Sequence, residues 1–281
     1  MYHEYYFCIP SDPKLVDILD KEAVRYNVSG ADEYLTSGAK VPAFISFSLK
    51  GYSPLVDRIS VSFRARPQIR IVYSEKERTQ SHLLWMTPKM QKIDIQNSHQ
   101  ALVSLCSWQD YRGMARTHRE TQVLSFVIKN EPSSQSRTAF WSESTGFRHV
   151  FIDKRVRDLI ESNGLQDIGF RDVYLPSGIV SNNIFQLVPH SNIDSRQIVF
   201  GYGEKENICS RCGMKQYSFN DAYQLHLRTK GLQFGADLLV TDSIWGSGIS
   251  RPLYLVTQRF YQLMKQNKLA SNIHWDPVVL E

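Results

Sequence analysis

The chain has 281 residues, of which 42% are hydrophobic and 22% charged, and its net charge is +5. This composition is that of a globular protein with ample material for a core, and it excludes a disordered or fibrous chain. No apolar run reaches the roughly 18 residues of a membrane span, and the N-terminus lacks the basic start and apolar stretch of a signal peptide. We therefore expect a cytoplasmic protein that makes no contact with a membrane.

Residues 1–145 are expected to form a strand-rich N-terminal region. Helical spacing over Asp12–Tyr26, with Pro13 in the first turn, predicts one helix, and Asn97–Trp108 predicts another. Short runs of aromatic and β-branched residues, bounded by turn formers, predict the strands. These runs are Tyr5–Ile9, Ala43–Leu49, Ile59–Phe63, Ile69–Tyr73 and Val123–Ile128.

Residues 146–281 are expected to form an α+β region that contains two similar strand–helix–strand units, 151–175 and 255–280. Each unit starts with an apolar run, and a capping residue (Asp153 or Thr257) precedes the helical stripe. Each predicted helix ends at an Asn (Asn163 or Asn267), a residue that tolerates a left-handed turn. Aligned pairs include Arg155 with Arg259, Leu159 with Leu263 and Leu165 with Leu269. Both a duplication and two independent units of one type would give this pattern.

The whole pattern predicts an α+β fold with mixed, mainly antiparallel sheets and a few short helices. Basic residues are spread along the chain, with a mild cluster at Arg64, Arg66 and Arg70. A nucleic-acid footprint needs a denser basic stripe, so this cluster favours the solvated face of a hairpin over a phosphate-binding surface. Nucleic acid is therefore not an expected partner.

The sharpest local motif is the CxxCG sequence of Cys209, Cys212 and Gly213. Such a turn directs two thiolates at one metal, and His226 offers a third ligand, so these residues are the candidates for a structural zinc site. Two reduced thiols at a turn, or a redox pair, are the alternatives. Cys8 and Cys106 lie in mainly apolar segments and are expected to be buried thiols.

The sequence contains no recognised catalytic constellation. It lacks a nucleophile elbow and any pair of histidines at helical spacing, so we assign no catalytic or cofactor-binding residue. Trp245 lies in a Gly-flanked loop, where an exposed aromatic side chain would be an anchor for a protein partner; packing of the ring under the loop is the alternative. Trp275, which precedes Pro277 in the last predicted strand, is expected to be a core residue.

Four features of the C-terminal third occur in a recognisable order. They are the CxxCG motif, the segment Phe234–Leu239, the helix start Leu255–Phe260 and the closing segment Trp275–Leu280. This order resembles the double-CXXCG-motif immunity proteins and related immunity proteins of bacterial polymorphic toxin systems. The resemblance covers roughly Gln197–Glu281, and a single CxxCG replaces the two of the family, so the paired-knuckle metal site does not carry over.

The resemblance implies a non-enzymatic protein that binds a cognate bacterial toxin and neutralises it. The net positive charge favours a neutral or acidic surface on that partner. An enzyme of unrecognised type and a zinc-containing nucleic-acid-binding module are the two alternatives. A pocket with converging titratable groups would distinguish the first, and stoichiometric metal with salt-dependent nucleic-acid binding would distinguish the second.

Overall fold

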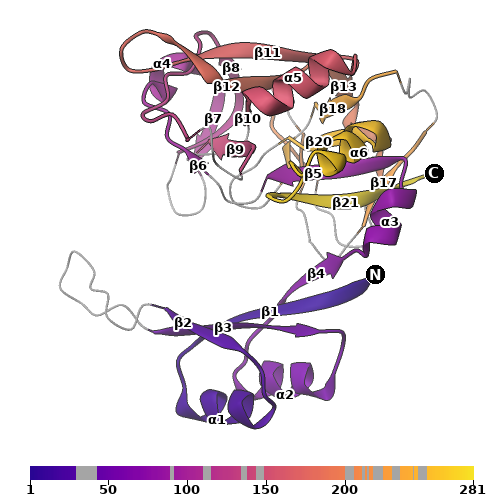
Figure 1. The fold of residues 1–281 in the computed structure, drawn as a ribbon. Helices are drawn as coiled ribbons and strands as arrows, with labels where there is room; N and C mark the ends of the chain where they lie inside the picture. The colour runs from indigo at the N-terminus through magenta and orange to yellow at the C-terminus, as the bar shows by residue number, and fades with distance from the viewer. Residues whose placement is uncertain are drawn as a thin grey trace, which may run out of the picture. The chain divides into compact units, whose positions relative to one another are not determined.

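The protein is described from a computed structural model (Figure 1). The structure describes residues 1–29, 43–88, 92–109, 115–133, 138–143, 149–199, 206–210, 213, 215–217, 224–229, 235–242, 244–245 and 252–281. For 103–109, 115–121, 206–207, 215–217 and 244–245, and at 92, 99 and 195, it describes the backbone alone. The chain forms two compact units, the first built on Met1–Ser74 and the second on Glu75–Phe219 and Leu225–Glu281. The fold is α+β with mostly antiparallel sheets, as the sequence predicts.

Unit 1 is a four-stranded antiparallel sheet with two helices on one face (Figure 1). In chain order its elements are β1 (Tyr2–Pro10), α1 (Pro13–Lys21), β2 (Tyr26–Ser29), β3 (Phe44–Lys50), α2 (Pro54–Ser62) and β4 (Gln68–Val72). The strand order β2-β3-β1-β4 is the split β-α-β arrangement. Alternate residues of β1 and β3, such as Phe7 and Phe47, are buried against Leu15 and Leu19 of α1 and Ile59 of α2.

Two expectations for unit 1 are wrong. Ile59–Phe63 is not a strand, because it lies at the end of α2 and in the turn that follows; Ile59 is buried while Val61 is 79% exposed. Cys8 is not buried, because it lies on the face of β1 opposite to Phe7 and Ile9.

Unit 2 contains a five-stranded sheet and a seven-stranded sheet. The first has the order β11-β12-β10-β9-β6, and the second has the order β13-β18-β20-β5-β21-β17-β14. The strands of the first are β6 (Lys92–Ile93), β9 (Phe140–Glu143), β10 (Val150–Asp153), β11 (Ile168–Tyr174) and β12 (Val180–Pro189). Those of the second are β5 (Leu83–Pro88), β13 (Ser191–Ile193), β14 (Ile198–Val199), β17 (Leu225–Leu227), β18 (Leu238–Thr241), β20 (Tyr254–Thr257) and β21 (Ile273–Leu280).

The remaining elements are short. They are α3 (Glu75–Gln80), α4 (Ser98–Ala101), the hairpin β7 (Leu102–Gln109) and β8 (Ala115–Gln122), the 3-10 turn Ser195–Gln197, and a three-stranded sheet of β15 (Glu206–Ile208), β16 (Lys215–Tyr217) and β19 (Ile244–Trp245). The helix expected over Asn97–Trp108 ends at Ala101, because the backbone from Leu102 pairs with β8. No helix among the described residues is long and apolar enough to cross a membrane.

Both predicted strand–helix–strand units are present, as β10–α5 (Lys154–Ser162)–β11 and β20–α6 (Gln258–Gln266)–β21. Their helices start alike, because the Asp153 carboxylate accepts a hydrogen bond from the Val156 N–H and the Thr257 hydroxyl accepts one from the Phe260 N–H. They also end alike. Asn163 and Asn267 donate side-chain hydrogen bonds to the carbonyls of Leu159 and Leu263, both at 2.9 Å.

The left-handed residue after each helix is not the Asn that the sequence suggested. Asn163 and Asn267 have φ of −98° and −91°, and the following residues, Gly164 and Lys268, have φ of 60°. In both units the next residue, Leu165 or Leu269, donates its N–H to a carbonyl five positions earlier, which is the Schellman ending.

The correspondence between the copies extends beyond these units. In one sheet β10 is antiparallel to β9 and to β12, and β6 is parallel to β9; in the other β20 is antiparallel to β18 and to β5, and β13 is parallel to β18. The register also agrees. Leu187 lies opposite Val150 and Phe170, and Met86 lies opposite the equivalent residues Tyr254 and Trp275. Five strands that agree in order, direction and register indicate a duplication.

The two copies exchange one strand. The first copy runs from β5 to β11 and the second from β12 to β21, yet β5 lies between β20 and β21, and β12 lies between β10 and β11. Unit 2 therefore begins before β5. For this reason the compact units meet at Ser74 and Glu75, whereas the expected boundary lay at residues 145 and 146. One hydrophobic cluster joins both copies and contains Met86, Ile152, Phe185, Phe260 and Trp275.

A buried carboxylate also links the copies. Asp237, which is 5% exposed, accepts hydrogen bonds from the Thr257 hydroxyl at 2.6 Å and from the Gln166 N–H of the first copy at 2.9 Å. Arg259 lies 3.4 Å from the same carboxylate and also donates to the Asn163 carbonyl of the first copy. Asp237 thus pairs with three donors from two segments, the start of α6 and the turn after α5.

Deletion of β5 tests the strand exchange. A chain that begins at Glu75 should unfold in one cooperative transition, whereas a chain that begins at Ile93 should not, because β20 and β21 would lose the strand between them. Thermal unfolding followed by circular dichroism measures this difference. Equal melting of the two shortened chains would show that β5 is dispensable.

Asp237→Ala tests the link between the copies. We expect it to lower the free energy of unfolding by about 3 kcal/mol, because it leaves buried donors without an acceptor. The matched control is Asp158→Ala, which removes an exposed i,i+4 pair with Lys154 and should cost no more than about 0.5 kcal/mol. Urea unfolding of both variants gives the comparison, and equal effects would contradict the role of Asp237.

Candidate binding pocket

The structure describes part of the predicted metal site. Cys209 follows β15, its side chain is half-buried, and its carbonyl accepts a 2.8 Å hydrogen bond from the N–H of Gly213, which has φ of 67°. The chain therefore bends at the CxxCG motif as expected. Cys212 lies outside the described residues, and among the described residues no three Cys, His, Asp or Glu side chains gather around one point. The zinc site stays a prediction.

His226, the third predicted ligand, lies in β17, where its Nδ1 is 2.6 Å from Oε1 of Glu281. This contact occupies one ring nitrogen and leaves Nε2 as the atom that could hold a metal, which is a common arrangement at metal sites. The backbone of Trp245 lies in β19, and its side chain is outside the described part, so its role as an anchor stays a prediction. Trp275 is 5% exposed and is confirmed as a core residue.

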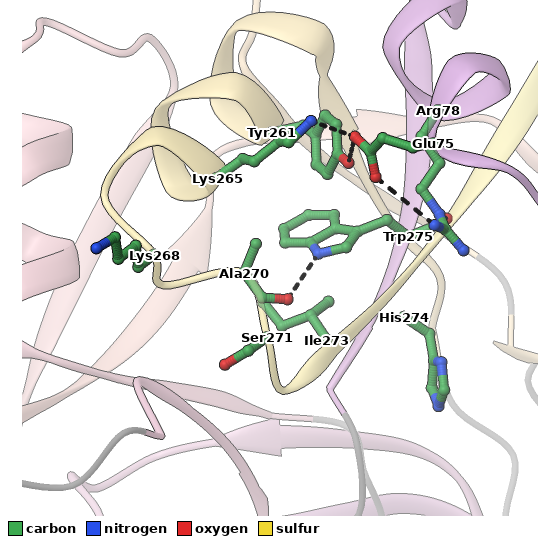
Figure 2. Close-up of a pocket in the computed structure, with 10 residues that line it drawn as sticks. All are labelled: Glu75, Arg78, Tyr261, Lys265, Lys268, Ala270, Ser271, Ile273, His274 and Trp275. Atoms are coloured by element: carbon green, nitrogen blue, oxygen red, sulfur yellow. Dashed lines mark hydrogen bonds and ion pairs between the residues drawn. The ribbon is translucent and has the colours of Figure 1, made fainter.

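An open pocket with a volume of about 380 Å³ lies within unit 2, between α3, α6 and the start of β21 (Figure 2). Its lining combines charged and aromatic side chains from two segments that are far apart in sequence. The lining residues are Glu75, Arg78, Tyr261, Lys265, Lys268, Ala270, Ser271, Ile273, His274 and Trp275. None of these residues except Trp275 was singled out by the sequence analysis.

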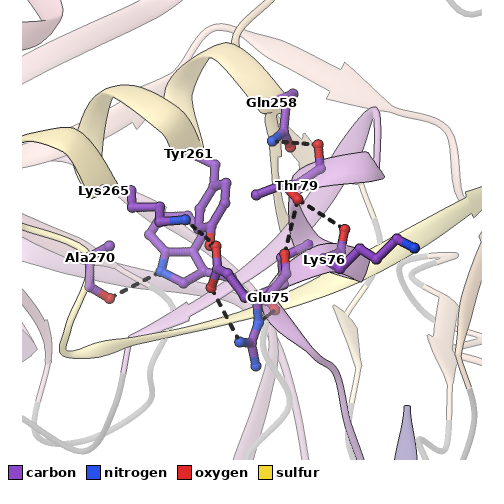
Figure 3. A network of polar contacts seen from close by, with 9 residues as sticks. Glu75, Lys76, Thr79, Gln258, Tyr261, Lys265 and Ala270 are labelled. Atoms are coloured by element: carbon purple, nitrogen blue, oxygen red, sulfur yellow. Dashed lines mark hydrogen bonds and ion pairs between the residues drawn. The ribbon is translucent and has the colours of Figure 1, made fainter.

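The carboxylate of Glu75 is the centre of the polar network at this pocket (Figure 3). Its Oε1 accepts a hydrogen bond from the Tyr261 hydroxyl at 2.8 Å and another from Lys265 Nζ, and Arg78 Nη1 lies 3.8 Å from Oε2. Desolvation would raise the pKa of Glu75, but the hydrogen bonds from Lys265 and Tyr261 and the charges of Lys265 and Arg78 lower it below its ordinary value. Glu75 is therefore an ionised acceptor at neutral pH.

Two aromatic rings form the apolar part of the pocket. Tyr261 and Trp275 meet edge to face with their ring centroids 5.3 Å apart, and both are almost fully buried. Burial, and then the hydrogen bond to Glu75, raise the pKa of Tyr261, so its hydroxyl stays protonated and remains a donor. Trp275 donates its indole N–H to the Ala270 carbonyl at 3.1 Å, and its own carbonyl accepts from Arg78 Nε at 3.0 Å. The aromatic rings are thus held in place.

The pocket has an excess of positive charge. Its lining contains three cationic side chains, Arg78, Lys265 and Lys268, and a single carboxylate, that of Glu75. Lys268 has no ion-pair partner among the described residues, and the Schellman turn fixes its backbone in the left-handed conformation. An open site with cations around an aromatic floor is suited to binding an anionic group.

The first copy has different side chains at the equivalent positions of the described residues. At the position of Tyr261 it has Arg157, whose guanidinium lies over the rings of Phe185 at 4.4 Å and Phe170 at 5.6 Å. Glu161, at the position of Lys265, accepts a 3.0 Å hydrogen bond from Arg157. The equivalent space is therefore filled by the copy's own side chains. A helix like α3 is also missing, since a turn from Leu175 to Ile179 precedes β12.

A second polar cluster, which is largely buried, lies beside the five-stranded sheet. Glu143 is 2% exposed, and its Oε2 lies 3.9 Å from Nε2 of His149. The other ring nitrogen of His149 lies 3.3 Å from Nε2 of Gln186, which forms a reciprocal amide pair with Gln122. Glu143 and His149 are mostly shielded from solvent, with side chains 3% and 19% exposed, whereas the pocket of α3, α6 and β21 is open, so we assign the functional site to that pocket.

Comparison with known proteins gives no family for the chain. No protein-family model, no curated protein and no solved structure matches it. Any statement about function therefore depends on the pocket and on the resemblance of the C-terminal motifs.

The Glu75 network should contribute to stability only when Glu75 is ionised. Because its folded pKa lies below the ordinary 4.5, the contribution is present above about pH 4.5 and is lost as the pH falls through the folded pKa. Glu75→Gln should therefore lower the free energy of unfolding at pH 7 by up to about 1 kcal/mol, a small value because the side chain is half exposed.

Urea unfolding of the wild type and of Glu75→Gln at pH 7 and pH 3 measures this effect. The difference between the two proteins should shrink at the lower pH. The control is Glu161→Gln, which removes the equivalent exposed pair of the first copy. A difference between wild type and Glu75→Gln that stays constant from pH 7 to pH 3 would contradict the ionised network.

Proposed function

We propose that the protein is a non-enzymatic immunity protein of the cytoplasm, which binds a cognate bacterial toxin and neutralises it. The pocket of α3, α6 and β21 is its contact site for the toxin. The observation that carries this proposal is the combination of an open cationic rim with a rigid aromatic floor. Trp, Tyr and Arg side chains are the residues that contribute most to binding at protein interfaces.

The way the polar groups are engaged supports binding rather than catalysis. Glu75 is held ionised by two hydrogen-bond donors and the charge of Arg78, the hydroxyl of Tyr261 is kept protonated, and the indole N–H of Trp275 is already donated. A general acid or base is most effective with a pKa near the working pH, and the shifts of Glu75 and Tyr261 both lead away from neutral pH. The pocket is thus prepared as a fixed surface for a partner.

The scaffold supports the same proposal. Both sheets of unit 2 contribute to one core, and the strand exchange ties the two copies together, so the helix and turn that form the pocket are firmly supported. A preformed contact surface reduces the entropy lost on binding. Two of the four features that resemble immunity proteins, Leu255–Phe260 and Trp275–Leu280, lie partly or wholly on α6 and β21, which line the pocket.

Co-purification with the toxin tests the proposal directly. The tagged full chain, expressed in its source cell, should retain the C-terminal domain of a toxin encoded by a neighbouring gene, and its expression should protect a sensitive cell from that toxin. Absence of both binding and protection would refute the function.

A charge reversal tests the pocket as the contact site. Lys268→Glu should weaken toxin binding by at least about tenfold, because it places a like charge against an acidic partner surface. Lys14→Glu is the matched control, since it makes the same change at an exposed position of α1 and should leave the affinity unchanged. Calorimetric titration at low salt measures both. Equal affinities for the two variants would exclude this pocket from the interface.

A further inference from the structure

The donors that hold Glu75 form a carboxylate site. A phenol hydroxyl, an ammonium group and a guanidinium, from Tyr261, Lys265 and Arg78, converge on the two oxygens of one carboxylate (Figure 2). Tyr261 and Lys265 donate hydrogen bonds to this carboxylate, and Arg78 adds an ion pair at 3.8 Å. The ring of Trp275 lies beneath them and offers an apolar surface for the methylene groups of an acidic side chain.

Another carboxylate could displace that of Glu75 from this site. Its side chain is 52% exposed and belongs to the six-residue helix α3, whereas Tyr261 is 2% exposed and fixed in the nine-residue helix α6. Exposed ion pairs of this type are weak, because each charge remains partly hydrated. Tyr261 is therefore better fixed than the carboxylate that accepts its hydrogen bond.

We infer that Glu75 is an internal stand-in for an acidic side chain of the partner, which takes its place on Lys265 and Tyr261 when the complex forms. The inference rests on the proposed function for the identity of the partner, and the chemistry of the site specifies a protein carboxylate. Lys268 lies on the rim without an ion-pair partner among the described residues, and it would hold a second acidic side chain. Displaced Glu75 remains solvated at the surface, so the exchange leaves no buried charge unpaired.

An acidic peptide tests the carboxylate site without the toxin. N-acetyl-tetraglutamate amide is titrated into the ¹⁵N-labelled full chain, with the tetraglutamine peptide as the uncharged control. We expect the glutamate peptide alone to shift the backbone signals of α6 and of the turn from Lys268 to Trp275. Equal shifts from the two peptides, or shifts confined to other segments, would overturn the inference.

Removal of the stand-in should improve binding. Glu75→Ala should bind the glutamate peptide about threefold more tightly than Glu77→Ala, which removes the same charge from the same helix outside the pocket. Lys265→Ala should lose binding. The affinity of Glu75→Gln for the peptide should lie between those of Glu75→Ala and the wild type. Because this variant keeps the size of the side chain, it shows whether an effect of Glu75→Ala comes from unfolding of α3. Equal affinities of Glu75→Ala and Glu77→Ala would show that Glu75 does not compete.

Inorganic phosphate distinguishes a carboxylate site from a general anion site. It should displace the glutamate peptide only at concentrations well above the dissociation constant of the peptide, and equally tight binding of phosphate would overturn the carboxylate assignment. The outcomes for the peptide and for the toxin are separate. Toxin binding without peptide binding would refute the stand-in alone, and peptide binding without toxin binding would refute the immunity function alone.

Discussion

Met86 and Leu187 each lie between two strands of the opposite copy, and this exchange of β5 and β12 is the constraint on which the rest of unit 2 depends. A central strand is hydrogen-bonded on both sides, so neither sheet can form from its own copy alone. The exchange makes the shared core continuous, and it places α5 and α6 in one hydrophobic cluster. Stability is thereby distributed over contacts between segments that are distant in sequence.

Duplication supplied two equivalent sites, and the copies have diverged at one helix. In α5 the charged residues pair with each other and cover aromatic rings, whereas in α6 a buried Tyr and an exposed Lys are directed to a carboxylate on α3. The ion pair at the start of each helix also differs between the copies. Arg155 pairs with its own capping residue, Asp153, while Arg259 pairs with Asp237, because Thr257 is the cap in that copy. One scaffold has therefore been kept while its surface chemistry changed.

The features that could be predicted from the sequence are those set by neighbouring residues. Caps, helical stripes and apolar runs are set by neighbouring residues, so α1, α5, α6 and the strands beside them were found. The prediction of a strand over Ile59–Phe63 was wrong, because its alternating apolar residues fit a strand as well as a helix. Ser53 and Pro54 mark the start of a helix, and of the alternating residues only Ile59 is buried. The exchange could not be predicted, since strand pairing across the chain leaves no local signal. The pocket was missed for the same reason, because Glu75 and Lys265 are 190 residues apart. The aligned copies did carry one hint, which is the replacement of Glu161 by Lys265.

We propose that the donors of α6 and the turn to β21 form the surface that the partner covers. Hydrogen–deuterium exchange of the full chain with and without the toxin tests it most directly, because a contact protects the amides beneath it. The account predicts that protection concentrates on α3 and on the segment from Tyr261 to Trp275, with the equivalent segment of the first copy unchanged. Protection confined to unit 1, or equal in both copies, would contradict it.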